Sequence, residues 1–188
     1  MKLIATPIND LLIIEPTVYG DDRGFFLESF QKDTFAALGL PTHFVQDNHS
    51  YSTQGTLRGL HFQKKQTQGK LVRVIQGEVF DVAVDLRKDS GTYGQTFSVI
   101  LSGQNKRMFW VPEGFAHGFY VMSAGAHFVY KCTQPYSPEH EVSLCWNDSD
   151  LSINWPLVNK IEPMLSIKDK DGVSFSEVGC FINNIYVS

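Results

Sequence analysis

The residues best suited to chemistry in this chain lie in the segment Leu57-Arg58-Gly59-Leu60-His61-Phe62-Gln63. Arg58 carries a guanidinium that binds anions, and His61 carries an imidazole that ionises near neutral pH. Side chains alternate between the two faces of a strand, so Arg58 and His61 are predicted to point to opposite faces. A bend or bulge at Gly59 would bring both of them to one site. The segment therefore predicts a general base beside an anion-binding group.

Three further residues extend this pattern to acid–base chemistry beside a carbonyl group. Lys70 offers a cation for an enolate oxygen, and Tyr130 offers a phenol that can return a proton. Asp169 could orient a histidine by accepting its second N–H, although a solvated, charged loop is the alternative interpretation of Ser166–Lys170. Together with His61, this set suits removal of a proton next to a carbonyl. The sequence alone does not place Tyr130 opposite His61.

Short strands are the elements that must position these residues. Apolar runs alternate with turn signals, which is typical of an antiparallel sandwich or barrel. The expected strands are Leu11–Glu15, Gly24–Phe30, Leu71–Ile75, Val79–Leu86, Thr96–Leu101, Arg107–Val111, Gly118–Val121 and Ala126–Tyr130. A short helix is expected over Lys32–Leu38 and a second near Asn147–Leu151. No repeat or linker interrupts the chain, so residues 1–188 are expected to form a single, mostly β domain.

Pro112-Glu113-Gly114-Phe115-Ala116-His117 has the P-x-G-x-x-H form of the second cupin motif. In the first cupin motif, Gln63 takes the place of the second histidine ligand and Lys70 takes the place of the glutamate ligand. A cation repels a metal ion, and an amide is a poor replacement for an imidazole. The chain therefore resembles a cupin barrel whose metal site has been replaced. A metal-dependent cupin oxygenase remains an alternative.

Composition and charge indicate an ordinary globular protein. Hydrophobic residues make up 43% and charged residues 19%, and the formal net charge of −4 argues against nucleic acid or acidic membranes as partners. The three cysteines include no C-x-x-C pair, which favours reduced thiols. No apolar run is long enough to span a bilayer, so a cytoplasmic location is expected.

A series of motifs in one order resembles the dTDP-4-dehydrorhamnose 3,5-epimerase family from Ile4 to about Lys170. The motifs are Asp22-Arg23-Gly24-Phe25-Phe26-x-Glu28, Gln46-Asp47-Asn48-His49-Ser50, Leu57–His61, Gly69–Arg73, Gly77–Asp85, Pro112–Phe119, Phe128–Lys131 and Leu165-Ser166-x-Lys168-Asp169. From about residue 171 the tail has no match, and an extra strand, an ordered tail and disorder all stay open for it.

The resemblance implies an all-β, cupin-type jelly-roll barrel with a few short helices, usually a homodimer, with no metal or organic cofactor. It implies inversion of C3 and C5 of a dTDP-4-keto-6-deoxyhexose, from dTDP-4-dehydro-6-deoxyglucose to dTDP-4-dehydrorhamnose. Close alternatives are an epimerase acting at C3 only or at C5 only, or a 3,4-ketoisomerase. A non-catalytic cupin that binds nucleotide sugars is the alternative of a different class.

The resemblance also implies a role for each matching residue. The catalytic set comprises the base His61, its carboxylate Asp169, the proton donor Tyr130 and the cation Lys70 near the C4 oxygen. The substrate-binding positions are Arg23, Glu28, Gln46, Asn48, Arg58, His117, Glu141 and Lys168, with Arg58 at the diphosphate. Because N-terminal strands cross to the partner subunit in this family, Arg23 and Glu28 are expected to serve the neighbour's site.

Overall fold

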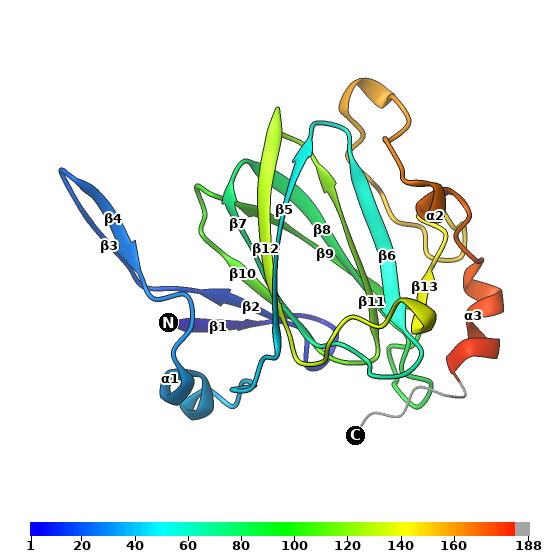
Figure 1. The fold of residues 1–188 in the computed structure, drawn as a ribbon, viewed down its shortest axis with the longest axis horizontal. Helices are drawn as coiled ribbons and strands as arrows, with labels where there is room; N and C mark the ends of the chain where they lie inside the picture. Colours follow the sequence, from blue (N-terminus) through cyan, green and yellow to red (C-terminus); the bar gives the residue numbers. More distant parts are fainter. Residues whose placement is uncertain (183–188) are drawn as a thin grey trace.

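The apolar runs of the sequence form two antiparallel β-sheets that pack face to face (Figure 1). The computed structural model describes residues 1–182. The larger sheet contains, in spatial order, β1 (Lys2–Ala5), β2 (Leu12–Glu15), β10 (Met108–Val111), β7 (Lys70–Gln76), β12 (Gly125–Cys132) and β5 (Gln46–Thr53). The smaller sheet contains β13 (Glu141–Ser143), β6 (Leu57–Gln63), β11 (Phe115–Val121), β8 (Glu78–Asp85) and β9 (Thr96–Ser102).

The main hydrophobic core lies between the two sheets. Alternate residues of each strand point inward, so Val72 and Phe128 of the larger sheet meet Val79 and Phe119 of the smaller one. The rings of Phe119 and Phe128 stack with their centroids 4.1 Å apart. Phe119 and Phe128 also border a cavity that is lined by polar residues of both sheets.

The N-terminal hairpin, β3 (Val18–Asp21) and β4 (Gly24–Leu27), extends away from the sheets (Figure 1). Its aromatic side chains are largely exposed: Tyr19 is 64% exposed, Phe25 is 62% exposed and Phe26 is 68% exposed. An extended arm of this kind with exposed aromatic residues is typical of a segment that packs on another chain.

The helix expected at Lys32–Leu38 is present as α1 (Lys32–Ala37), which packs Phe35 against the outer side of the larger sheet. The helix expected near Asn147–Leu151 is wrong, because this segment forms turns. The Asp148 carboxylate accepts hydrogen bonds from the backbone N–H groups of Asp150 and Phe175, and such side-chain bonds compete with helix formation.

After β13 the chain crosses the outside of the smaller sheet. One 3₁₀ turn, η1 (Pro138–His140), precedes β13, and a second, η2 (Val158–Lys160), follows it. The helices α2 (Ile167–Lys170) and α3 (Phe175–Ile182) come next. Val178 of α3 is buried, so the tail is ordered as a helix up to residue 182. Residues 183–188 of the unmatched tail lie outside the described residues.

Within residues 1–182, no helix is both long and apolar enough to cross a membrane. Cys132 and Cys145 are free thiols, and the side chain of Cys180 lies outside the description.

Candidate active site

All the residues proposed from the sequence except Arg23 and Glu28 line one cavity of about 390 Å³. The cavity lies between the polar parts of the two sheets. Its predicted members are Gln46, Asn48, Arg58, His61, Lys70, His117, Tyr130, Glu141, Lys168 and Asp169. They come from six different strands and from α2, so only the folded sandwich assembles them.

His61 is held by the carboxylate of Asp169, the residue that the family resemblance assigned to this position. Its Nε2 lies 2.5 Å from Oδ1 of Asp169, whose side chain is only 3% exposed. Ser166 caps α2 and donates its hydroxyl to the other oxygen of Asp169 at 2.7 Å. Burial would raise the pKa of Asp169, but the hydrogen bonds from His61 and Ser166 outweigh it and lower this pKa. The alternative of a solvated loop is therefore wrong for Asp169.

The second nitrogen of His61 is the one available for proton transfer. If Nε2 donates to Asp169, then Nδ1 carries the free lone pair and is the basic atom. Nδ1 lies 3.9 Å from Oε1 of Glu141. The other oxygen of Glu141 accepts from Lys168 at 2.7 Å and from the Tyr136 hydroxyl at 3.0 Å. Two carboxylates thus flank the imidazole, one on each ring nitrogen.

Gly59 allows Arg58 and His61 to reach the same cavity, which confirms the predicted bend. Gly59 has a φ of +116°, and the pairing of β6 with β11 shifts between His117 and Phe119. Arg58 donates from Nε to the Ser52 hydroxyl at 2.9 Å and so extends over the cavity. The strand therefore presents a guanidinium and an imidazole on one side.

We expect Gly59→Ala to destabilise the protein by about 2 kcal/mol or more, because its φ is strained for any residue with a Cβ. A Cβ at this position would also lie 2.6 Å from the Gly118 Cα. Urea unfolding monitored by circular dichroism measures the loss. Gly91→Ala is the matched control, since its Cβ meets nothing within 4 Å. Equal stability of the two variants would contradict this account of β6.

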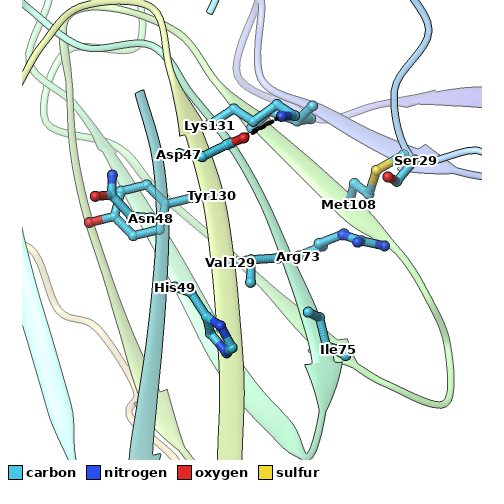
Figure 2. Close-up of a pocket in the computed structure, with 11 residues that line it drawn as sticks. Ser29, Asp47, Asn48, His49, Arg73, Ile75, Met108, Val129, Tyr130 and Lys131 are labelled. Carbon is cyan, nitrogen blue, oxygen red and sulfur yellow. Dashed lines mark hydrogen bonds and ion pairs between the residues drawn. The ribbon is translucent and has the colours of Figure 1, made fainter. Parts of the chain in front are cut away.

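Tyr130 enters the cavity from the larger sheet, whereas His61 enters from the smaller one. Tyr130 is paired with Asn48 on β5, and both side chains project to the same side of these strands (Figure 2). Burial, with the nearby Cys132 and Glu141, raises the pKa of Tyr130 to about 12. The phenol therefore stays protonated at neutral pH and could donate a proton from the sheet opposite that of His61.

The cupin ligand positions hold side chains with other functions. Gln63 donates to the Gln66 carbonyl at 2.7 Å and accepts from the Ser137 N–H at 2.9 Å, so it braces a loop. Lys70 lies 8% exposed at the start of β7, where burial lowers its pKa. Within residues 1–182, no group of three or more His, Cys, Asp and Glu side chains is arranged to hold a metal ion.

His117 lies directly opposite His61 in the register of β11 and β6. Its Nε2 contacts Oδ1 of Asp81 at 2.8 Å, and Asp81 is completely buried with its Oδ2 unpaired among the described residues. Burial raises the pKa of Asp81, although His117 and Lys70 oppose that effect. His117 is therefore a fixed member of the cavity wall.

Arg23 and Glu28 lie apart from the cavity. Arg23 is exposed on the β3–β4 hairpin and pairs with Asp21 at 2.5 Å. Glu28 follows β4 and accepts a hydrogen bond from Thr34 at the start of α1. The structure of one chain therefore does not bring these two residues to His61.

A second hollow, of about 320 Å³, lies on the outer side of the larger sheet (Figure 2). Arg73, Ile75 and Lys131 face this hollow, and Lys131 pairs there with Asp47 at 2.8 Å. In Figure 2, Asn48 and Tyr130 point away from these residues, toward the interior. Tyr130 and Asn48 therefore border both the outer hollow and the inner cavity, but their side chains are directed at the inner cavity.

Several side chains that line or support the cavity were not selected from the sequence, among them Tyr136, Ser166 and Asp81. The Ser166-x-x-Asp169 spacing is a helix-capping signal and could have indicated the support of Asp169. Asp81 interrupts an apolar strand, which marks a buried carboxyl in need of a partner. No local signal places Tyr136, because it reaches Glu141 from the loop after β12.

This fold and this cavity define a cupin-type jelly roll with an acid–base centre between its sheets. The family model for dTDP-4-dehydrorhamnose 3,5-epimerase matches residues 5–177, which extends beyond the last motif recognised in the sequence. The chain belongs to the dTDP-4-dehydrorhamnose 3,5-epimerase family. The fold and family expected from the sequence are therefore confirmed.

Individual relatives agree with this assignment. The dTDP-4-dehydrorhamnose 3,5-epimerase of Pseudomonas aeruginosa is 54% identical over 96% of this chain and 99% of its own length. The crystal structure of the epimerase RmlC from Legionella pneumophila, in complex with dTDP-4-keto-L-rhamnose, is 53% identical. It covers 100% of this chain and 99% of its own, with a TM-score of 0.93. The 3′-monoepimerase ChmJ from Streptomyces bikiniensis, in complex with dTDP-quinovose, is 29% identical over 94% of this chain and 90% of its own, with a TM-score of 0.87.

Proposed function

We propose that this protein inverts C3 and C5 of dTDP-4-dehydro-6-deoxyglucose and so forms dTDP-4-dehydrorhamnose. One observation carries the proposal: the His61–Asp169 pair and Tyr130 enter the same cavity from facing sheets, with Lys70 also lining it. A base and an acid on opposite sides of a sugar ring are what inversion at carbon requires.

The C4 ketone of the substrate acidifies the protons at both C3 and C5. In the proposed reaction, His61 Nδ1 takes the carbon-bound proton while Lys70 stabilises the enolate oxygen that forms at C4. Tyr130 then delivers a proton to the opposite face of the carbon. A flip of the sugar ring between the two steps presents the second centre to the same pair.

The remaining cavity residues bind and orient the substrate in this proposal. Arg58 supplies a planar, permanently charged group for the diphosphate, and its hydrogen bond to Ser52 fixes its direction. Gln46 and Asn48 are joined by a side-chain hydrogen bond of 3.0 Å. With His117, Glu141 and Lys168, they form the polar wall that would receive the sugar and the nucleotide.

Chemical trapping tests the reaction. The protein is incubated with dTDP-4-dehydro-6-deoxyglucose, and the ketone is reduced with borohydride. Mild acid then hydrolyses the bond between the sugar and the diphosphate, and the released 6-deoxyhexoses are separated by chiral chromatography. Inversion at C5 converts a D-sugar into an L-sugar, so 6-deoxy-L-hexoses with inverted C3 are expected. Recovery of D-sugars alone would overturn the proposed double inversion.

A single epimerase is the second candidate, since the chain shares its fold with a 3′-monoepimerase. It would yield D-sugars inverted at C3, and a 3,4-ketoisomerase would move the ketone. A non-catalytic sugar-binding cupin would return the substrate unchanged but would be stabilised by it. The proposed reaction uses no metal or organic cofactor, and one equivalent of iron or zinc in the active protein would contradict this part.

The proposal extends to the assembly and its setting. We propose one cupin-type domain over residues 1–188, acting in the cytoplasm as a homodimer with exchanged N-terminal strands. The bare aromatic residues of the β3–β4 hairpin and the half-exposed Ile75 and Tyr51 outside the larger sheet supply apolar surface for a second copy. Arg23 and Glu28 would then complete the partner's cavity.

Mixing two variants of low activity tests this exchange. His61→Asn removes the base of its own site, and Arg23→Ala would weaken the site of the neighbour. If the arms cross, a mixed dimer contains one site with an intact His61 and an intact Arg23, so unfolding and refolding the two variants together should restore activity. If Arg23 serves its own chain, no site in the mixture is whole and activity stays at the level of the variants.

A further inference from the structure

After the first of the two proposed inversions, His61 and Tyr130 are both in the wrong protonation state for the second. His61 has gained a proton from one carbon, and Tyr130 has given one to the opposite face. The site then holds an imidazolium and a phenolate. His61 cannot take a proton from the second carbon until it has lost the first. If the proposed function holds, His61 must lose this proton between the two inversions.

The Asp169 side of the imidazole offers no exit for this proton. Both carboxylate oxygens of Asp169 are already bonded, one to His61 and the other to the hydroxyl of Ser166. The side chain is only 3% exposed, so little of it is open to water. Only 20% of the His61 side chain is exposed, and a sugar in the cavity would cover that part. The proton must therefore leave through another side chain at Nδ1.

Glu141 lies beside Nδ1 of His61, and its hydrogen-bond partners Tyr136 and Lys168 lie nearer the surface. Its Oε1 lies 3.9 Å from Nδ1, within reach of a hydrogen bond after a small rotation of either side chain. Its Oε2 is held by Lys168 at 2.7 Å and by Tyr136 at 3.0 Å. Exposure increases along this path, since the Glu141 side chain is 16% exposed and Tyr136 is 47% exposed.

We propose that Glu141 is the proton outlet of His61, positioned by Tyr136 and Lys168, and that it resets the base between the two inversions. In this step the imidazolium N–H bond breaks and an O–H bond forms on Oε1 of Glu141. Water at the cavity mouth then takes the proton from the carboxyl group. The Tyr130 phenolate regains a proton from water, so each inversion releases one proton and takes up one.

The surroundings of Glu141 suit a group that passes a proton on without keeping it. Burial would raise the pKa of Glu141, but the hydrogen bond from Lys168 and the charge of a protonated His61 outweigh it and hold this pKa below its ordinary value. The carboxyl group therefore returns to its ionised form after each transfer. Tyr136 and Lys168 both bind Oε2, which leaves Oε1 directed at His61.

If Glu141 is the proton outlet, its replacement should change the number of centres inverted each time a substrate molecule binds. Glu141→Gln keeps the shape and the hydrogen bonding of the side chain but cannot take up a proton. With the base left charged after one inversion, the sugar should leave with one centre changed. We expect the ratio of doubly to singly inverted product to fall at least about tenfold, and Tyr136→Phe to lower it in the same direction. The products are identified by reduction and chiral chromatography.

Two controls separate proton transfer from binding. Glu139→Gln changes an exposed carboxylate two residues away and should leave the product ratio unchanged. Added formate or imidazole should restore double inversion in Glu141→Gln, because a small base can enter the mouth and accept the proton. A loss of both products in equal proportion, with a raised KM and no response to added base, would overturn the outlet and assign Glu141 to substrate binding alone. Absence of any inversion in the unmodified protein would instead overturn the proposed function.

Discussion

His61→Asn should lower kcat by about 10³-fold while KM changes little, because general-base catalysis contributes rate rather than binding. Asparagine keeps a polar side chain beside Asp169 but has no nitrogen that accepts a proton at neutral pH. The groups that hold the nucleotide, such as Arg58, are untouched. A stopped assay with borohydride trapping at several substrate concentrations measures both constants.

His43→Asn is the matched control for this substitution. His43 is exposed in the segment between α1 and β5 and lies outside the cavity. Its replacement should leave both constants unchanged, and circular dichroism should show the same fold in both variants. If His61→Asn retained more than about a tenth of the activity, His61 would not be the base, and the account of the His61–Asp169 pair would be wrong.

Lys70→Met should lower activity by about 10²- to 10³-fold and at the same time make the protein more stable. The loss of activity follows because the substitution removes the cation proposed to stabilise the developing enolate oxygen. The gain in stability follows because the buried ammonium is deprived of water, as its lowered pKa indicates. Methionine fills a similar volume without charge, so we expect a gain of about 1 to 3 kcal/mol at neutral pH. Thermal unfolding measures the change.

The pH dependence of stability follows from the direction of this shift. The pKa of Lys70 is lower in the folded protein than in the unfolded chain, so the unfolded chain binds the proton more tightly. The cost of the buried charge is therefore fully present below the folded-state pKa. It declines as pH rises from there to the unfolded value. The gain from Lys70→Met should shrink over the same range, and a variant less stable than the unmodified protein at pH 7 would contradict this account.

The same shift predicts which group limits activity at high pH. The pKa of Lys70 is lower than its ordinary value, whereas the pKa of Tyr130 is raised to about 12. The phenol is therefore still protonated at a pH where the ammonium has been lost.

Much of this site could be predicted from the sequence because its motifs have fixed local meanings. The glycine at position 59 indicated where β6 must bend to place Arg58 and His61 together, and the structure shows that bend. The loss of ligand types at Gln63 and Lys70 favoured acid–base over metal chemistry. The strands with alternating apolar residues were found within a few residues of their ends.

The rest depended on contacts between distant parts of the chain. The polar strand β5 was not expected, since its residues face a cavity on one side and the outside on the other. The segment around Asp148 forms turns where a helix was expected. The local sequence did not indicate this, because the Phe175 N–H that Asp148 binds comes much later in the chain. Tyr136 contacts the site through its hydrogen bond to Glu141, and no local sequence pattern predicts this pairing.

The pattern of deuterium uptake is the most direct test of the central claim that one His–Asp base and one facing tyrosine invert two centres. The protein is incubated with dTDP-4-dehydro-6-deoxyglucose in deuterated water, and proton NMR follows the signals of C3–H and C5–H. The account predicts that both signals disappear in the presence of the unmodified protein and that both persist with His61→Asn. Exchange at C3 alone would contradict double inversion, and exchange at neither position would contradict the proposed function as a whole.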